Sequence, residues 1–238
     1  YYYLKMAFEL WLFEGGYLFQ HVATLFQIMK ILRKKSNEMV SLETNVLFLL
    51  GALSRIGWMW DSMLKNFALA YIEIILAIGS LGYIIYLFWL NNSQNYVYLS
   101  VTLPPFLKLY TLIPVVVILS FLFNPGSYWF SSQVFVSLGI FSEAIGLLPQ
   151  LYMIRKNTDC GDLSELYIVF LGTARFFRLL FWIKMYFDGN KFMALIIADI
   201  IHCATLFNFI YNVIKKWSGS GLPTTFTEIK NNSNKKMF

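Results

Sequence analysis

Apolar residues gather into long runs separated by short polar segments, and each run approaches the length that a helix needs to cross a bilayer. A spanning helix requires roughly 20 mostly apolar residues. Runs of this kind predict seven transmembrane helices, near residues 17–33, 44–62, 66–90, 107–123, 130–154, 164–187 and 192–214. The pattern predicts an all-α polytopic membrane protein.

The first run is the most polar, because Gln20, His21, Gln27 and Lys30 interrupt it. Polar side chains at this depth are expected to face the interior of the bundle or to reach toward its ends. The preceding segment is either an extension of this helix or a separate interfacial helix. The predicted domains are the N-terminal segment 1–16, a seven-helix membrane domain 17–217 and a polar, basic C-terminal tail 218–238.

Composition supports a membrane location. The 238 residues are 58% hydrophobic and 13% charged, with a mean hydropathy of +0.59. A water-soluble domain of this size would not bury that much apolar surface in one core, so most of it is expected to face lipid. The formal net charge of +6 indicates no nucleic-acid partner, because the basic residues lie beside the hydrophobic runs as they do in oriented membrane proteins.

Lysine and arginine are distributed unequally between alternate loops, which predicts the orientation. The basic side carries Lys30, Arg33, Lys34, Lys35, Lys108, Arg155, Lys156, Lys215, Lys216, Lys230, Lys235 and Lys236. The other side carries only Lys5, Lys65, Lys184 and Lys191. The C-terminus is therefore predicted to be cytoplasmic, or on the matrix side in a mitochondrion, and the N-terminus to lie on the opposite side.

The chain also contains an internal repeat. A shift of 123 positions aligns Gln27 with Gln150, Ser41 with Ser164 and Arg55 with Arg178. The matched helices are four apart and therefore run in the same direction. The shift predicts two parallel three-helix repeats joined by helix four.

Charged residues at membrane depth are costly and are usually functional or paired. Arg175, Arg178 and Trp182 share one helical stripe, as do Asp199 and His202. One interpretation is a polar cavity that captures an anion, with arginine suited to a carboxylate. The other is a set of interhelical ion pairs that fix the bundle without a ligand. His21 and His202 are candidate pH-sensing residues.

Catalysis is not expected. The sequence has no His-Glu-x-x-His, no Cys-x-x-Cys, no glycine-rich phosphate loop and no nucleophile-elbow serine. Two histidines and two separated cysteines make no credible zinc site. We therefore predict a non-enzymatic protein with no catalytic residues, no metal and no cofactor.

The segment Glu143-Ala-Ile-Gly-Leu-Leu-Pro-Gln-Leu-Tyr-Met-Ile154, followed by Phe170-Leu-Gly172, Arg175 and Trp182, resembles the receptors that retrieve escaped endoplasmic-reticulum proteins by a C-terminal Lys-Asp-Glu-Leu signal. The resemblance extends as a pattern over 17–217. It implies the Pro-Gln-loop fold of seven helices and a cytosolic C-terminus. It also implies a ligand site in which Arg55 helps to hold the peptide carboxylate, with Glu143 as a buried acid and with Arg175 and Trp182 in the cavity.

Several positions depart from the family pattern. A ladder arginine of the family is replaced by Phe13, two acids that would pair the lysine of the signal are replaced by Trp58 and Gln133, and a cavity tyrosine is replaced by Arg178. The family's pH-sensing histidine aligns with Gln20, one position from His21. These departures imply an altered or lost signal specificity.

The sequence thus favours a retrieval receptor in an endoplasmic-reticulum or Golgi membrane that binds a peptide C-terminus or another small anion through Arg55, Glu143, Arg175, Arg178 and Trp182. Lys235 and Lys236, three and four residues from the printed end, resemble a trafficking signal for vesicle coat proteins. The alternatives are a structural subunit of a larger membrane complex, for example in the mitochondrial inner membrane, and a small-solute facilitator.

Overall fold

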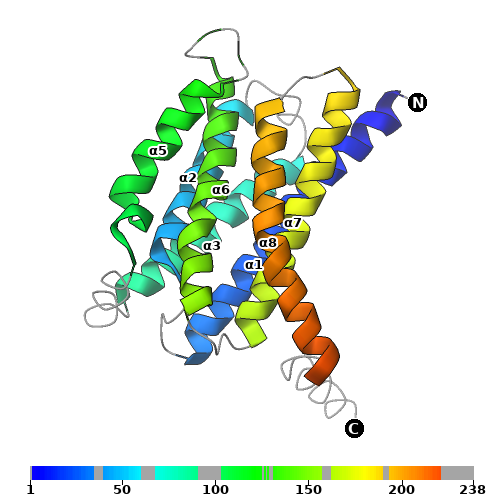
Figure 1. The fold of residues 1–238 in the computed structure, drawn as a ribbon. Helices are drawn as coiled ribbons and strands as arrows, with labels where there is room; N and C mark the ends of the chain where they lie inside the picture. The colour runs from blue at the N-terminus through cyan, green and yellow to red at the C-terminus, as the bar shows by residue number, and fades with distance from the viewer. Residues whose placement is uncertain are drawn as a thin grey trace.

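The structure is a computed structural model that describes residues 2–34, 40–59, 68–90, 103–124, 126, 128, 131–156, 162–189 and 193–220. These residues form a helical bundle (Figure 1). The α-helices are α1 (Tyr2–Lys34), α2 (Leu42–Met59), α3 (Ala68–Leu90), α5 (Leu109–Leu122), α6 (Gln133–Lys156), α7 (Asp162–Phe187) and α8 (Met193–Ser220), and η2 (Pro105–Leu107) is a short 3-10 helix. The prediction of an all-α bundle of seven α-helices is confirmed.

The first helix is longer than its predicted span, 17–33, by more residues than any other described helix. Residues before position 17 continue directly into α1, which is 33 residues long. Gln20, Gln27 and Lys30 are buried in the bundle and His21 is half-buried. The polar positions of this helix therefore face protein, as expected from the cost of exposing them to lipid.

Length and apolarity mark four helices as able to cross a membrane by themselves, namely α3, α6, most of α7 and most of α8. The other three lie beside them in the bundle (Figure 1). Of these, α5 is apolar but only 14 residues long, while α1 and α2 carry polar residues that are buried inside the protein. Burial against neighbouring helices explains why these two need less apolar surface than a lipid-exposed helix.

The helix contacts follow the predicted repeat. Within the first repeat α3 packs on α1 and α2, and within the second α8 packs on α6 and α7. The two repeats join through α1 against α7 and α2 against α6, which are equivalent pairs, and α5 packs on α6. Two parallel three-helix repeats joined by the fourth α-helix therefore describe the arrangement.

Small residues allow the two repeats to approach closely. At the α2–α6 crossing, a Cβ added to Gly51 would lie 2.8 Å from Ser142 Oγ and 3.3 Å from the Gly139 carbonyl oxygen. At the α1–α7 crossing, a Cβ added to Gly16 would lie 3.0 Å from the Ala174 carbonyl oxygen. Gly16 and Ala174 are the positions 123 residues from Gly139 and Gly51, so the same crossing occurs twice. Small residues at such contacts are typical of helices packed in membranes.

Replacing Gly51 by valine should destabilise the bundle, because the added side chain overlaps atoms of α6. Overpacking of this kind costs about 1–3 kcal/mol. The measurement is the unfolding temperature of the purified protein in lipid nanodiscs. Gly79→Val is the matched control, since a Cβ at Gly79 has no atom within 4 Å. Equal losses in both variants would show that the crossing is not tightly packed.

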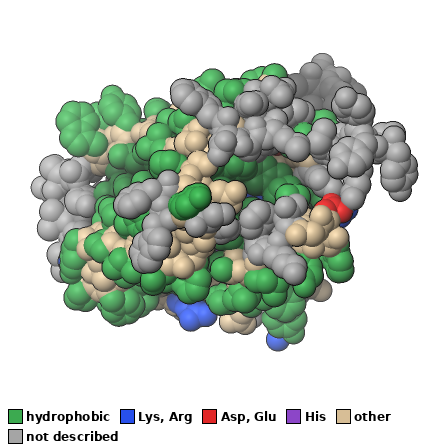
Figure 2. All heavy atoms as spheres, turned by 90° about the horizontal axis from the view of Figure 1, so that it is seen from above, with side chains coloured by type: hydrophobic (Ala, Val, Ile, Leu, Met, Phe, Trp, Pro, Cys, Tyr) green, Lys and Arg blue, Asp and Glu red, His purple; other side chains and the backbone are tan. Residues whose placement is uncertain are grey.

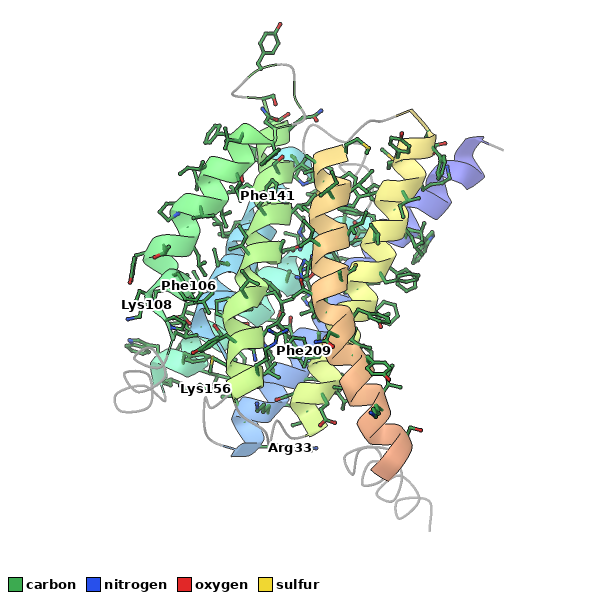
Figure 3. All side chains as sticks on the ribbon, in the orientation of Figure 1. Arg33, Phe106, Lys108, Phe141, Lys156 and Phe209 are labelled. Atoms are coloured by element: carbon green, nitrogen blue, oxygen red, sulfur yellow. The ribbon has the colours of Figure 1, made fainter. Side chains whose placement is uncertain are left out.

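The two ends of the bundle differ in charge. Arg33, Lys108 and Lys156 lie toward the lower end as drawn, at the end of α1, before α5 and at the end of α6 (Figure 3). The opposite end, viewed from above, presents mostly hydrophobic side chains among the described residues, with few charges (Figure 2). Basic residues assigned to one side from the sequence thus lie toward one end of the bundle, and the orientation of that end in the membrane stays a prediction.

Gln150 of the Pro-Gln pair has a structural role at the lower end. Its Oε1 accepts a hydrogen bond from the backbone N–H of Ser41 at 2.8 Å, and its own backbone N–H donates to Thr44 Oγ1 at 3.2 Å. Ser41 Oγ in turn accepts from the Thr44 N–H at 3.1 Å, the usual pattern of an N-cap. The two hydrogen bonds of Gln150 therefore tie α6 of the second repeat to the start of α2 in the first.

Candidate functional site

Arg55 and Glu73 form a buried ion pair between α2 and α3. Arg55 Nη1 donates to Glu73 Oε2 at 2.6 Å and Nη2 donates to Oε1 at 3.1 Å. The relative exposure of the two side chains is 6% and 2%. A guanidinium and a carboxylate joined by two parallel bonds form the most directional ion pair that proteins use.

Glu143 of α6 bridges two arginines of α7. Its Oε2 accepts from Arg175 Nη1 at 2.6 Å and also from Arg178 Nη1. Arg178 Nη2 also lies 3.5 Å from Asp199 Oδ1 of α8. Both arginines and Asp199 have a relative exposure of 0%. The network therefore joins α6, α7 and α8 through groups that water does not reach.

The two ion-pair clusters correspond to each other in the repeat. Arg55 and Arg178 are 123 positions apart, and each pairs with an acid on the third helix of its own repeat, Glu73 on α3 and Asp199 on α8. These acids are 126 positions apart, so the shift seen in the sequence does not align them.

Residues of α1 lie between the clusters. The Tyr17 ring centroid is 3.6 Å from Arg55 Cζ and 5.1 Å from Arg178 Cζ, so one aromatic ring contacts both cations. Gln20 Nε2 donates to Glu143 Oε1 at 3.4 Å. Gln20 and Glu143 are themselves 123 positions apart, so the equivalent helices of the two repeats meet at this hydrogen bond.

A small cavity lies beside the first cluster. Its volume is about 10 Å³, roughly the space for one water molecule. It is lined by Phe13, Glu14, Arg55, Trp58, Met59, Ala70, Glu73 and Ile74. Glu14 is 1% exposed, and neither its Oε2 nor Arg55 Nε has a hydrogen-bond partner among the described residues. Two carboxyl groups thus line the cavity beside one guanidinium.

Other residues predicted for the site occupy its edge. Trp182 is buried against Ile140 and Leu195 and interacts with Asp199. His202 is 3% exposed, and neither of its ring nitrogens has a partner in the described part of the chain. His21 lies one turn after Tyr17 on α1 and interacts electrostatically with Glu73. The two candidate pH sensors thus belong to different clusters.

The structure brings Glu143, Arg175 and Arg178 together as one group and places Arg55 in a separate pair. Sequence reasoning missed Glu14 and Tyr17. The signal for these two was present as the spacing of Glu14, Tyr17 and His21 at i, i+3 and i+7, one face of a helix. Lys235 and Lys236 lie outside the described residues.

Comparison with known proteins identifies the family of the chain. The sequence profile of the ER lumen protein retaining receptor family matches residues 36–185. The chain belongs to this family.

Several relatives carry the name of this family and match most of the length of this chain. The ER lumen protein-retaining receptor of Caenorhabditis briggsae is 22% identical over 196 residues, 82% of this chain and 88% of the relative. Receptor 3 of Mus musculus is 25% identical over 207 residues, 84% of this chain and 92% of the relative, and receptor 3 of Danio rerio is 26% identical over 210 residues, 85% and 93%. The family indicates an endoplasmic-reticulum or Golgi membrane, and the comparisons lend no support to the mitochondrial alternative.

Proposed function

We propose that this chain is a non-catalytic trafficking receptor of the retrieval route whose arginines hold its own helices instead of a peptide carboxylate. The observation that carries the proposal is that Arg55, Arg175 and Arg178 each pair with an acid of the same chain. Its signal specificity therefore differs from the Lys-Asp-Glu-Leu specificity that the sequence resemblance implies.

The argument rests on what carboxylate capture requires. A guanidinium binds a carboxylate best through two parallel N–H groups that are free of other acceptors. Glu73 already accepts both parallel bonds from Arg55. A peptide carboxylate would have to displace Glu73 and leave that acid buried without a partner, which costs more than an exposed exchange.

The arginines of the second cluster are also paired within the chain. Glu143 and Asp199 supply two carboxyl groups for Arg175 and Arg178. Arg175 retains Nε and Nη2 without partners among the described residues, but its side chain is fully enclosed. An incoming anion would add a third negative charge to a cluster in which both guanidiniums are already paired with carboxyl groups.

A secretion assay tests this function. In cells depleted of their own retrieval receptors, the chain should reach the endoplasmic reticulum or Golgi membranes, yet a secreted reporter ending in Lys-Asp-Glu-Leu should still appear in the medium. The same reporter with the last residue deleted is the control. Retention of the Lys-Asp-Glu-Leu reporter alone would overturn the proposal.

A second candidate is a structural subunit of a membrane complex, and the internal pairing of the arginines favours it too. Stoichiometric co-purification with other subunits after mild detergent extraction distinguishes it from a receptor. Under the receptor proposal, Lys235 and Lys236 are the residues that would contact a vesicle coat. The small-solute facilitator has less support, because the cavity beside Arg55 holds about one water molecule.

A further inference from the structure

We propose that the cavity between α1, α2 and α3 binds a primary ammonium group, with Glu14 as its main acceptor. The inference deepens the proposed function, on which it rests, by naming a cationic ligand class for a receptor whose arginines are occupied. The ammonium group can belong to a free amine or to a lysine side chain.

Unequal charge around the cavity is the first argument. Glu14 and Glu73 both line it and Arg55 is the cation that lines it. Both oxygens of Glu73 accept from Arg55, while Glu14 Oε2 is enclosed and has no partner among the described residues. A buried carboxylate is stable only when a cation or a hydrogen-bond donor meets it. The cavity therefore supplies one acceptor in excess.

The walls of the cavity have the chemistry that an ammonium group prefers. Phe13 and Trp58 both line it, with their ring centroids 5.8 Å apart in an edge-to-face arrangement. Aromatic rings attract a desolvated cation, and an ammonium group has three N–H donors. Glu14 can accept one of them, and each Glu73 oxygen keeps a lone pair that Arg55 does not use.

Size and position agree with this ligand. A cavity of about 10 Å³ admits one group the size of water, and an ammonium head is of that size. Arg55 lies four residues before the end of α2, and Ala70 lies two residues after the start of α3. The cavity is thus near the end that the basic residues assign to the lumen.

Among the described residues, the charged and aromatic groups near the cavity do not supply a partner for Oε2 of the Glu14 carboxylate. His21 interacts with Glu73 from the next turn of α1 and does not line the cavity. Tyr17 contacts Arg55 through its ring face at 3.6 Å. The acids of the second cluster are bonded to their own arginines.

The test measures binding of methylammonium chloride to the full chain in nanodiscs of uncharged lipid, by calorimetry and by unfolding temperature, at constant ionic strength. Saturable binding is expected, and Glu14→Gln should weaken it about tenfold or more, the loss that follows removal of one charged hydrogen bond. Glu43→Gln, a buried acid at the opposite end of α2, should leave it unchanged. N-acetyl-lysine methylamide in a parallel titration shows whether a side-chain ammonium binds as the free amine does.

Trp58→Leu provides a second variant that keeps Glu14, and it should weaken methylammonium binding several-fold, about the effect of losing one cation–π contact. Equal methylammonium binding to wild type and Glu14→Gln would overturn the inference. So would the same saturable signal in a titration with sodium chloride alone, or the absence of any saturable binding. Those results would not affect the proposed function, which the secretion assay tests separately. Conversely, retention of the Lys-Asp-Glu-Leu reporter would overturn the proposed function whatever the methylammonium titration gives.

Discussion

Replacement of Glu143 by glutamine should destabilise the bundle severely. Glutamine keeps the shape of the side chain and the contact to Gln20, but it removes the negative charge that Arg175 and Arg178 share. Two enclosed guanidiniums would then depend on Asp199, which lies 3.5 Å from Arg178. Removing one partner of a buried ion pair costs about 3–5 kcal/mol. The measurement is the free energy of unfolding in nanodiscs under increasing denaturant.

The control for this variant is an acid in an exposed pair. Asp188 accepts from Lys184 in the turn that follows α7, where the two side chains are 21% and 30% exposed. Surface pairs contribute about 0–1 kcal/mol, so Asp188→Asn should change the unfolding free energy little. If Glu143→Gln were no more harmful than Asp188→Asn, Glu143 would not be the centre of a buried network.

Arg55→Leu should have an effect of similar size. It leaves Glu73 without its partner, enclosed beside Glu14 in a cavity that has lost its guanidinium. The expected cost is again about 3–5 kcal/mol, because an uncompensated buried charge remains. The measurement is the same free energy of unfolding in nanodiscs.

Arg155→Leu is the matched arginine control. Arg155 is exposed near the end of α6, with its Cζ 5.0 Å from the Phe209 ring centroid. An exposed cation–π contact is worth about 0.5–1 kcal/mol, so its loss should be small. An Arg55→Leu variant as stable as Arg155→Leu would mean that Arg55 does not neutralise the acids beside it.

The membrane fold could be predicted because its signals are local. Runs of apolar residues located all seven helices to within a few residues, with two exceptions. One is the early start of α1, where Lys5, Glu9 and Glu14 interrupt the hydrophobic pattern, and the other is the end of α8, which continues past residue 214 to Ser220. The repeat was visible because Arg55 and Arg178, and Gln27 and Gln150, keep a constant spacing. Residues equivalent under that spacing meet directly, as Gln20 and Glu143 do.

From the sequence, pairing of the charges within the bundle was only one of two interpretations. Arg55 and Glu73 are 18 positions apart on different helices, and nothing in the spacing says which face of α3 turns toward α2. The bond depends on how two helices are rotated against each other, which packing of the whole bundle determines. Glu14 was missed for a related reason, since it precedes the run that marked the first span.

The departures from the family pattern also gain a physical context. Phe13 and Trp58 stand where the resemblance implies a ladder arginine and an acid, and both line the cavity that contains Glu14. Arg178, in place of a cavity tyrosine, joins Glu143 to Asp199. Phe13 and Trp58 thus add aromatic walls and Arg178 adds internal ion pairs, in agreement with the proposal that the ligand specificity has changed.

The central claim is that the arginines are neutralised within the chain, and the coupling free energy between Arg55 and Glu73 tests it most directly. A double-mutant cycle compares Arg55→Leu, Glu73→Leu and the double variant in nanodiscs. The double variant should recover most of the stability that Arg55→Leu loses, giving a coupling of at least about 2 kcal/mol, at the upper end for residues in direct contact. A coupling near zero, with Arg55→Leu as stable as the wild type, would contradict the claim and leave Arg55 available to a ligand.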